Sequence, residues 1–225
     1  MMNMTVTASL IFAVAEAAGA WFYHKTESPK WRGLLSAFGL GFAATVVLFD
    51  VLPDATEHYS VGYLLAACAA VATFAIWKRT NRESGEQAGA SVNAVAVGGM
   101  ALHNFAEGAI LASLTGPLSA LFMLGAILHK LPEGMATYAL LGGKKSARNL
   151  VFAMGSAILI PIGMLVRIPI AIEQPVMAMM AGVILAAVAT TMASKKAEGE
   201  AFGFISKVAP YLAGALIGGV SCLLA

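Results

Sequence analysis

The stretch that decides the fold is 91–141, SVNAVAVGGMALHNFAEGAILASLTGPLSALFMLGAILHKLPEGMATYALL. Two apolar runs, 91–114 and 117–141, are separated there only by Thr115 and Gly116. An α-helix needs about 20 apolar residues to cross a bilayer, so each run predicts a membrane-spanning helix. Because the connection between them is so short, the two helices are expected to be antiparallel neighbours.

Apolar runs of similar length fill the rest of the chain and predict eight spans in all. They are about 5–24, 33–53, 59–77, 91–114, 117–141, 149–170, 175–193 and 204–224. The third break, 78–90, has the composition of a mobile linker, and the sequence Glu173-Gln-Pro175 predicts a corner before span seven. Residues 1–225 therefore form a single all-α transmembrane domain in this interpretation.

The composition excludes several other classes of protein. Of the 225 residues, 59% are hydrophobic and only 12% are charged, whereas soluble domains are about 25% charged. A disordered chain, a nucleic-acid-binding protein with a basic face and an ordinary soluble enzyme are all inconsistent with these values. The lipid bilayer is the expected surrounding, and no nucleic-acid partner is expected.

Basic residues lie almost entirely in alternate breaks between the spans. Twelve of the 14 do so, namely Lys25, Lys30, Arg32, Lys78, Arg79, Arg82, Lys144, Lys145, Arg148, Lys195, Lys196 and Lys207. Because basic loops stay in the cytoplasm, this alternation predicts a multi-pass protein of the cell membrane with both termini outside. The two exceptions, Lys130 and Arg167, fall within predicted spans.

Two copies of one ionisable motif lie near the middle of spans four and five. Span four contains His103-Asn-Phe-Ala-Glu107-Gly, and span five contains His129-Lys-Leu-Pro-Glu133-Gly. Residues i and i+4 share a helical face, so each histidine stacks with its glutamate. Charged groups in hydrocarbon are costly unless they are paired or functional. One such pair could be a structural hydrogen bond, but two at the same depth favour a common site.

Two imidazoles and two carboxylates are suitable ligands for a divalent transition metal, zinc first. Cadmium, iron, manganese and cobalt bind the same donor types, so the ligands alone do not choose among them. Asn104, beside His103, could add an oxygen. Pro132, Pro161 and Pro53 each remove a helical hydrogen bond, which indicates bent helices that line a cavity or pack against protein.

With these residues, the chain resembles the ZIP (Zrt/Irt-like protein) family of divalent-metal transporters, in particular its prokaryotic GufA-like and ZupT-like members. The resemblance covers the whole chain and implies a 3+2+3 inverted-repeat bundle, with spans four and five at its centre. It also implies that His103, Glu107, His129 and Glu133 form the primary metal site. Asn104 faces a second, adjacent metal in the family.

The second metal is placed in doubt by two departures from the family pattern. Lys130 stands where relatives with two metals have a carboxylate or an amide, and Ile160 stands where they can have a glutamate. Two glutamates and one ammonium give the empty site a charge of −1, and a bound divalent ion changes it to +1. We therefore expect the Lys130 ammonium to replace the second metal. The alternative is that Lys130 extends to the interface or points away.

Acidic residues also gather at the outer end of span two. Asp50, Asp54, Glu57 and His58 follow an i, i+4, i+7, i+8 pattern on one helical face and could form an electronegative entrance that concentrates cations. A solvated helix end is the simpler alternative. Glu16, within span one, is expected to face protein, although its partner cannot be read from the sequence.

The function expected from this pattern is uptake of a divalent metal into the cytoplasm, with the metal as transported substrate and no prosthetic group. The protein is then not an enzyme. The main alternative is an intramembrane zinc-dependent hydrolase, which would need an open coordination position and a base. Small residues at 214–218 are expected to form an exposed face that permits helix–helix contact and a homodimer.

Overall fold

We analysed a computed structural model that describes residues 2–57, 61–84, 87–113, 120–141, 145–166, 170–197 and 204–224. Every regular element in these ranges is helical, and the helices form eight rods. The rods are α1 (Met2–Lys25), α2–η1–α3 (Pro29–Val46, Val47–Val51, Leu52–Thr56), α4 (Gly62–Ser84), α5 (Gln87–Ser113), α6 (Ala120–Leu140), α7–α8 (Ala147–Ala157, Leu159–Gly163), α9 (Ile170–Ala197) and α10 (Phe204–Leu224).

Two of the three prolines singled out from the sequence accompany a departure from α-helical geometry. The π-helical turn η1 immediately precedes Pro53, and the break between α7 and α8 at Ile158 lies one turn before Pro161. A proline cannot donate to the carbonyl four residues earlier, so the helix adjusts at that point. Pro132, in contrast, lies inside the uninterrupted helix α6.

Several predicted boundaries were wrong. The segment expected to be a mobile linker, 78–90, is mostly helical, because α4 continues to Ser84 and α5 begins at Gln87. The expected corner at 173–175 lies inside α9. The last helix of predicted span six, α8, ends at Gly163, where the amides of Leu165 and Val166 donate to the carbonyls three residues earlier. Arg167 and His58 lie outside the described residues.

The same pairs of rods are in contact when each rod is replaced by its counterpart from the other half of the chain. The exchange pairs α1 with α7–α8, α2–α3 with α9, α4 with α10 and α5 with α6. Under it, the contact of α1 with α6 becomes that of α8 with α5, and the contact of α2 with α10 becomes that of α9 with α4. The contacts of α2 with α6 and of α4 with α5 become those of α9 with α5 and of α10 with α6.

Glycines set the two closest contacts around the central helices. A methyl group on Gly134 of α6 would lie 1.9 Å from the carbonyl oxygen of Glu16 on α1, and one on Gly19 would lie 2.0 Å from that of Leu131. The contact of α5 with α8 is built in the same reciprocal way by Gly108 and Gly163, which face the carbonyls of Ile160 and Phe105. Close backbone approach of this kind is typical of helix packing in membranes.

Gly214 and Gly218, in the segment expected to be an exposed face, are buried. A methyl group on Gly214 would lie 1.9 Å from the carbonyl oxygen of Phe38 on α2, and one on Gly218 would lie 3.2 Å from that of Phe42. This small-residue face therefore packs inside the chain, against α2. The prediction that this face is exposed was wrong for both glycines.

The distribution of side chains is the reverse of that in a soluble protein. Large apolar side chains point outward from several rods, and Val14, Phe49, Val71, Leu165 and Leu216 are between 68% and 83% exposed. Meanwhile Glu16, Asn104, Lys130 and Glu133 are almost completely buried. Three helical stretches among the described residues are long and apolar enough to cross a membrane: Met4–Lys25, Pro29–Thr56 and Gln174–Met192.

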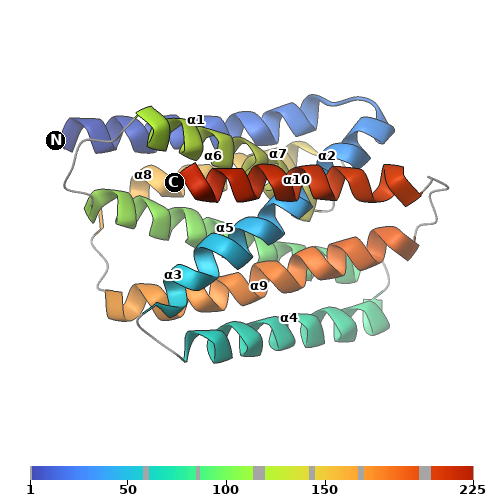
Figure 1. Ribbon diagram of the computed structural model, residues 1–225. Helices are drawn as coiled ribbons and strands as arrows, with labels where there is room; N and C mark the ends of the chain where they lie inside the picture. Colours follow the sequence, from blue (N-terminus) through green and yellow to red (C-terminus); the bar gives the residue numbers. More distant parts are fainter. Residues whose placement is uncertain are drawn as a thin grey trace.

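The first turn of α1 and the last turn of α10 lie towards one end of the bundle, and the C-terminal ends of α1, α4 and α9 lie at the other (Figure 1). At that second end, the buried hydroxyl of Tyr138 on α6 lies 2.8 Å from Nδ1 of His24 and accepts from the amide of Ser146 at 3.1 Å. Nearby, Lys145 donates to Glu27, and this hydrogen bond and charge hold the pKa of the Glu27 carboxyl below its ordinary value. These contacts join α1, α6 and the start of α7.

Candidate metal site

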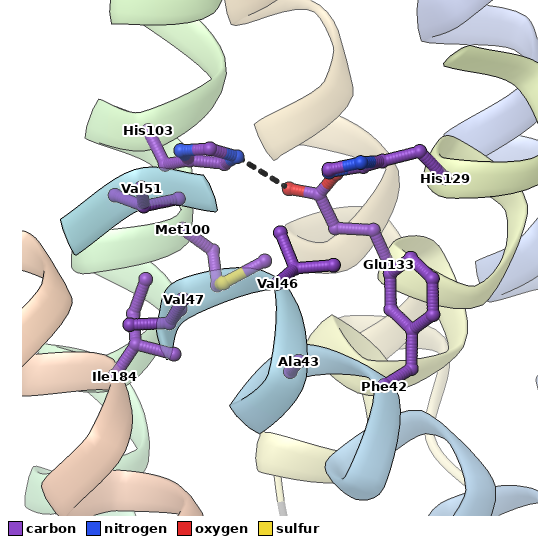
Figure 2. Close-up of a pocket in the computed structure, with 10 residues that line it drawn as sticks. All are labelled: Phe42, Ala43, Val46, Val47, Val51, Met100, His103, His129, Glu133 and Ile184. Carbon is purple, nitrogen blue, oxygen red and sulfur yellow. Dashed lines mark ion pairs between the residues drawn. The ribbon is translucent and has the colours of Figure 1, made fainter. Parts of the chain in front are cut away.

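The two central helices bring three potential metal ligands together. One ligand atom from each of His103, His129 and Glu133 lies within 4.8 Å of the others. His103 Nε2 is 3.4 Å from Glu133 Oε1, and His129 Nε2 is 3.6 Å from Glu133 Oε2. Figure 2 shows the carboxylate of Glu133 between the two imidazoles. The prediction that the two motifs face a common space is thus confirmed for these three residues.

Helix geometry and apolar packing position the two imidazoles. His129 and Glu133 are four residues apart on α6 and therefore lie on one face of that helix. The His103 and His129 rings are nearly parallel, with 6.5 Å between their centres and 19° between their planes. The ring of Phe42 on α2 lies nearly perpendicular to that of His129, with 5.5 Å between the ring centres. A narrow pocket lined by Phe42, Val46, Val47 and Ile184 adjoins the three ligands (Figure 2).

The site has unused hydrogen-bonding capacity. His129 Nε2, His103 Nδ1 and Glu133 Oε1 are buried and make no hydrogen bond. Buried polar atoms in proteins are nearly always satisfied, so such a cluster needs an explanation. Two imidazole nitrogens and a carboxylate around one point have the donor types and the spacing that suit a divalent transition metal.

Glu107, the fourth predicted ligand, adjoins this group but is engaged elsewhere. Its Oε2 is 3.9 Å from His103 Nε2, and its carboxylate forms an ion pair with the Lys130 ammonium. The Glu107 side chain is 27% exposed, whereas those of His103, His129 and Glu133 are between 3% and 7% exposed. Glu107 is therefore the ligand most accessible from outside the protein.

Lys130 is completely buried and points into the site, so the alternative in which it extends to the interface or points away is wrong. Its Nζ pairs with Glu107, lies 2.6 Å from Glu133 Oε2 and donates to Asn104 Oδ1 at 3.0 Å. Asn104 thus uses its amide oxygen on the lysine. A cation therefore already occupies the space between the two glutamates.

Glu16 is the residue that sequence reasoning left without a role. It lies on α1, is fully buried, and accepts a hydrogen bond from Asn104 Nδ2 at 2.8 Å. Its only sequence signal was a carboxylate inside an apolar span. The rotation of α1 that brings it to Lys130 follows from the close Gly19 and Gly134 contacts.

The predicted entrance residues lie on the second rod, in η1 and α3 and just after α3. Asp50 is half-buried in η1, Asp54 is exposed in α3, and Glu57 is exposed just after α3. Asp50 lies within electrostatic reach of Asp54 on one side and of Glu107 and Glu133 on the other. The backbone carbonyl of Asp54 accepts from Gln174 Nε2 of α9 at 3.3 Å.

No protein-family model and no curated protein matches the chain.

Proposed function

We propose that this protein is an integral membrane transporter that carries divalent transition-metal ions, zinc first, towards the cytoplasm, and that it is of the ZIP type. The observation that carries the proposal is the buried group of His103, His129 and Glu133 inside a bundle whose outer surface is apolar. Buried ionisable residues within membrane-spanning helices mark ion pathways more often than they serve packing.

The exchangeable contact pattern supports a 3+2+3 inverted repeat. In this proposal all eight rods cross the bilayer, and α5 and α6 form the central pair between the two three-rod repeats. Sites in transporters of this kind lie near the midplane at the repeat interface. His103 of α5 and His129 of α6 occupy that interface.

The alternation of basic residues supports the orientation. The basic breaks are assigned to the cytoplasmic side of the cell membrane, so both termini are outside. Asp50, Asp54 and Glu57 are then at the outer side, where their negative charges attract cations from solution. Asp50 links this entrance to the central carboxylates because its charge interacts with both groups.

The proposed transport cycle begins when a hydrated ion reaches Glu107, the most accessible ligand. The ion then exchanges water for the imidazole nitrogens and for Glu133. The two repeats rock against the central pair and open the site to the other side. Neutral imidazole is the binding form, so metal affinity falls at acidic pH.

An intramembrane zinc-dependent hydrolase is the alternative proposal. It requires an open coordination position, a general base and access for a peptide or lipid. The tight apolar lining by Phe42, Val46 and Ile184 and the engagement of Glu107 by Lys130 favour an ion over such a substrate.

The deciding experiment is uptake of radioactive zinc into proteoliposomes, with cadmium, iron, manganese and cobalt as competitors. We expect the wild-type protein to carry zinc and Glu133→Ala to lose uptake. Glu27→Ala, which removes an exposed glutamate remote from the site, is the matched control and is expected to retain uptake. A Glu133→Ala variant that transports at the wild-type rate refutes the site. Stoichiometric zinc binding without uptake refutes transport and favours the hydrolase or a structural metal.

A further inference from the structure

Glu16 is a third carboxylate beside the two glutamates of the proposed metal site. Its Oε1 accepts from Asn104 Nδ2 at 2.8 Å and from Ser156 Oγ at 3.2 Å. Its Oε2 is buried, makes no hydrogen bond, and lies 3.8 Å from the Nζ of Lys130. One oxygen of a fully buried carboxylate thus faces an ammonium group without being bonded to it.

Three other acceptors lie closer to the Lys130 ammonium than that oxygen does. An ammonium has three N–H donors, and the Nζ already has three closer acceptors, on Glu107, Glu133 and Asn104. Two of these acceptors are carboxylates that the proposed metal site requires. A divalent ion bound between them therefore displaces the ammonium from both, and Glu16 Oε2, which makes no hydrogen bond, lies 3.8 Å from it.

The charge balance supports the same conclusion. Counted with every group ionised, Glu16, Glu107 and Glu133 contribute −3 and Lys130 contributes +1, so the empty cluster has a formal charge of −2. One divalent ion brings this total to zero. Without Glu16, the loaded cluster would carry +1 in a buried environment, where uncompensated charge is strongly unfavourable.

We propose that Glu16 is a positioning residue that receives the Lys130 ammonium when a divalent metal binds to Glu107 and Glu133. The movement is small, since shortening the Nζ–Oε2 distance from 3.8 Å to about 2.8 Å makes a charge-assisted hydrogen bond. Lys130 then acts as an internal cation that holds the carboxylates in the empty state and moves aside without leaving the cluster. This inference rests on the proposed function.

The test compares metal affinity in a charge-matched set of purified full-length variants. Zinc binding is measured by calorimetry, and the ligand field is followed with cobalt absorption. Glu16→Gln changes the empty cluster from −2 to −1, whereas Glu16→Gln combined with Lys130→Gln restores −2. Ser9→Ala removes another buried polar side chain of α1, remote from the site, and is the matched control.

We expect Glu16→Gln to weaken zinc binding at least tenfold and the double variant to recover to within about threefold of the wild type, with Ser9→Ala unchanged. A Glu16→Gln affinity equal to that of the wild type overturns the proposal. A double variant as weak as Glu16→Gln also overturns it, because Glu16 would then act only through its hydrogen bond to Asn104. A wild-type protein that binds no metal instead refutes the proposed function itself.

A measurement on the unmodified side chain covers the case in which Glu16→Gln does not fold. The ε-carbons of the lysines are labelled with 13C, and the Lys130 signal is assigned by its absence in Lys130→Gln. We expect zinc to shift this signal in the wild-type protein while the lysine stays protonated. A Lys130 signal that does not change when zinc saturates the site excludes the transfer to Glu16.

Discussion

Gly134→Ala tests whether the glycine that follows Glu133 sets the distance between α6 and α1. The new methyl group would lie 1.9 Å from the carbonyl oxygen of Glu16, whereas ordinary contact begins at 3.4 Å, so the two helices must separate by about 1.5 Å. The opposing atom belongs to the backbone and cannot rotate away. Overpacking of this kind costs about 1–3 kcal/mol, and we expect a value of about 3 kcal/mol.

The same separation affects the site. The hydrogen bond between Asn104 Nδ2 and Glu16 Oε1 is 2.8 Å long, and a shift of about 1.5 Å breaks it. Metal sites tolerate only much smaller displacements than this. We therefore expect zinc affinity to fall at least about tenfold, which corresponds to about 1.4 kcal/mol. The measurements are reversible unfolding in mixed detergent micelles and calorimetric zinc titration.

Gly155→Ala is the matched control for this prediction. Gly155 lies in α7 with no atom within 4 Å of the added methyl group. Alanine is favoured over glycine in helices by up to about 1 kcal/mol, so this variant is expected to be as stable as the wild type or slightly more stable. If Gly134→Ala unfolds at the same detergent composition as Gly155→Ala, then the close packing of α1 on α6 does not control stability and the reasoning is refuted.

Three further predictions concern the central lysine and the end of the bundle. Lys130→Asp is expected to raise zinc stoichiometry from one ion towards two; a titration that still gives one ion contradicts the idea that Lys130 replaces a second metal. Tyr138→Phe is expected to lower the free energy of unfolding by about 1–3 kcal/mol, because the buried hydroxyl bonds two other segments. The matched control is Tyr63→Phe, at an exposed tyrosine, which is expected to change the free energy of unfolding by less than about 0.5 kcal/mol. Equal effects of the two substitutions would exclude a stabilising role for the buried hydroxyl. Lys145 lowers the pKa of Glu27, so this pair stabilises the fold at neutral pH and loses its effect as the pH falls through that lowered pKa. Glu27→Gln should shift the melting temperature by no more than about 2 °C at pH 7 and by less as the pH falls, and a larger shift at acidic pH would contradict this sign.

The sequence was sufficient to predict the helical rods and the meeting of His103, His129 and Glu133. Long apolar runs indicate helices because the bilayer leaves few other options for a backbone. The i, i+4 spacing then fixes which residues share a face. A short connection between two such helices makes their motifs neighbours, so the core of the site required no knowledge of the other six rods.

The ends of the helices were harder to predict, because charge and helix formation are separate properties. The segment 78–90 is polar and leaves the apolar run, yet lysine, arginine, glutamate, glutamine and alanine are good helix formers. Helices α4 and α5 therefore continue through most of it. Near Gly163 the opposite occurs, since the apolar run continues while the helix ends soon after Pro161.

The partners of Lys130 and Glu16 could not be predicted, because they depend on how α1 is rotated against α6. The sequence shows a carboxylate in an apolar run but not which neighbour it faces. That rotation follows from backbone contacts at Gly19 and Gly134, which are long-range and have no periodic signal. The glycine after each glutamate was visible in both motifs, yet only the structure gives its reason.

The reciprocal glycine contacts align the two halves of the chain residue by residue. Gly134 touches the carbonyl of Glu16 as Gly108 touches that of Ile160, so Glu16 and Ile160 occupy corresponding places on opposite sides of the central pair. By the same alignment Lys130 corresponds to Asn104. A nearly symmetric scaffold thus holds an asymmetric set of charges, with the ionic pair Glu16 and Lys130 on one side and the neutral pair Ile160 and Asn104 on the other. Different side chains at these two pairs of corresponding positions are enough to give the molecule a preferred side for its charge.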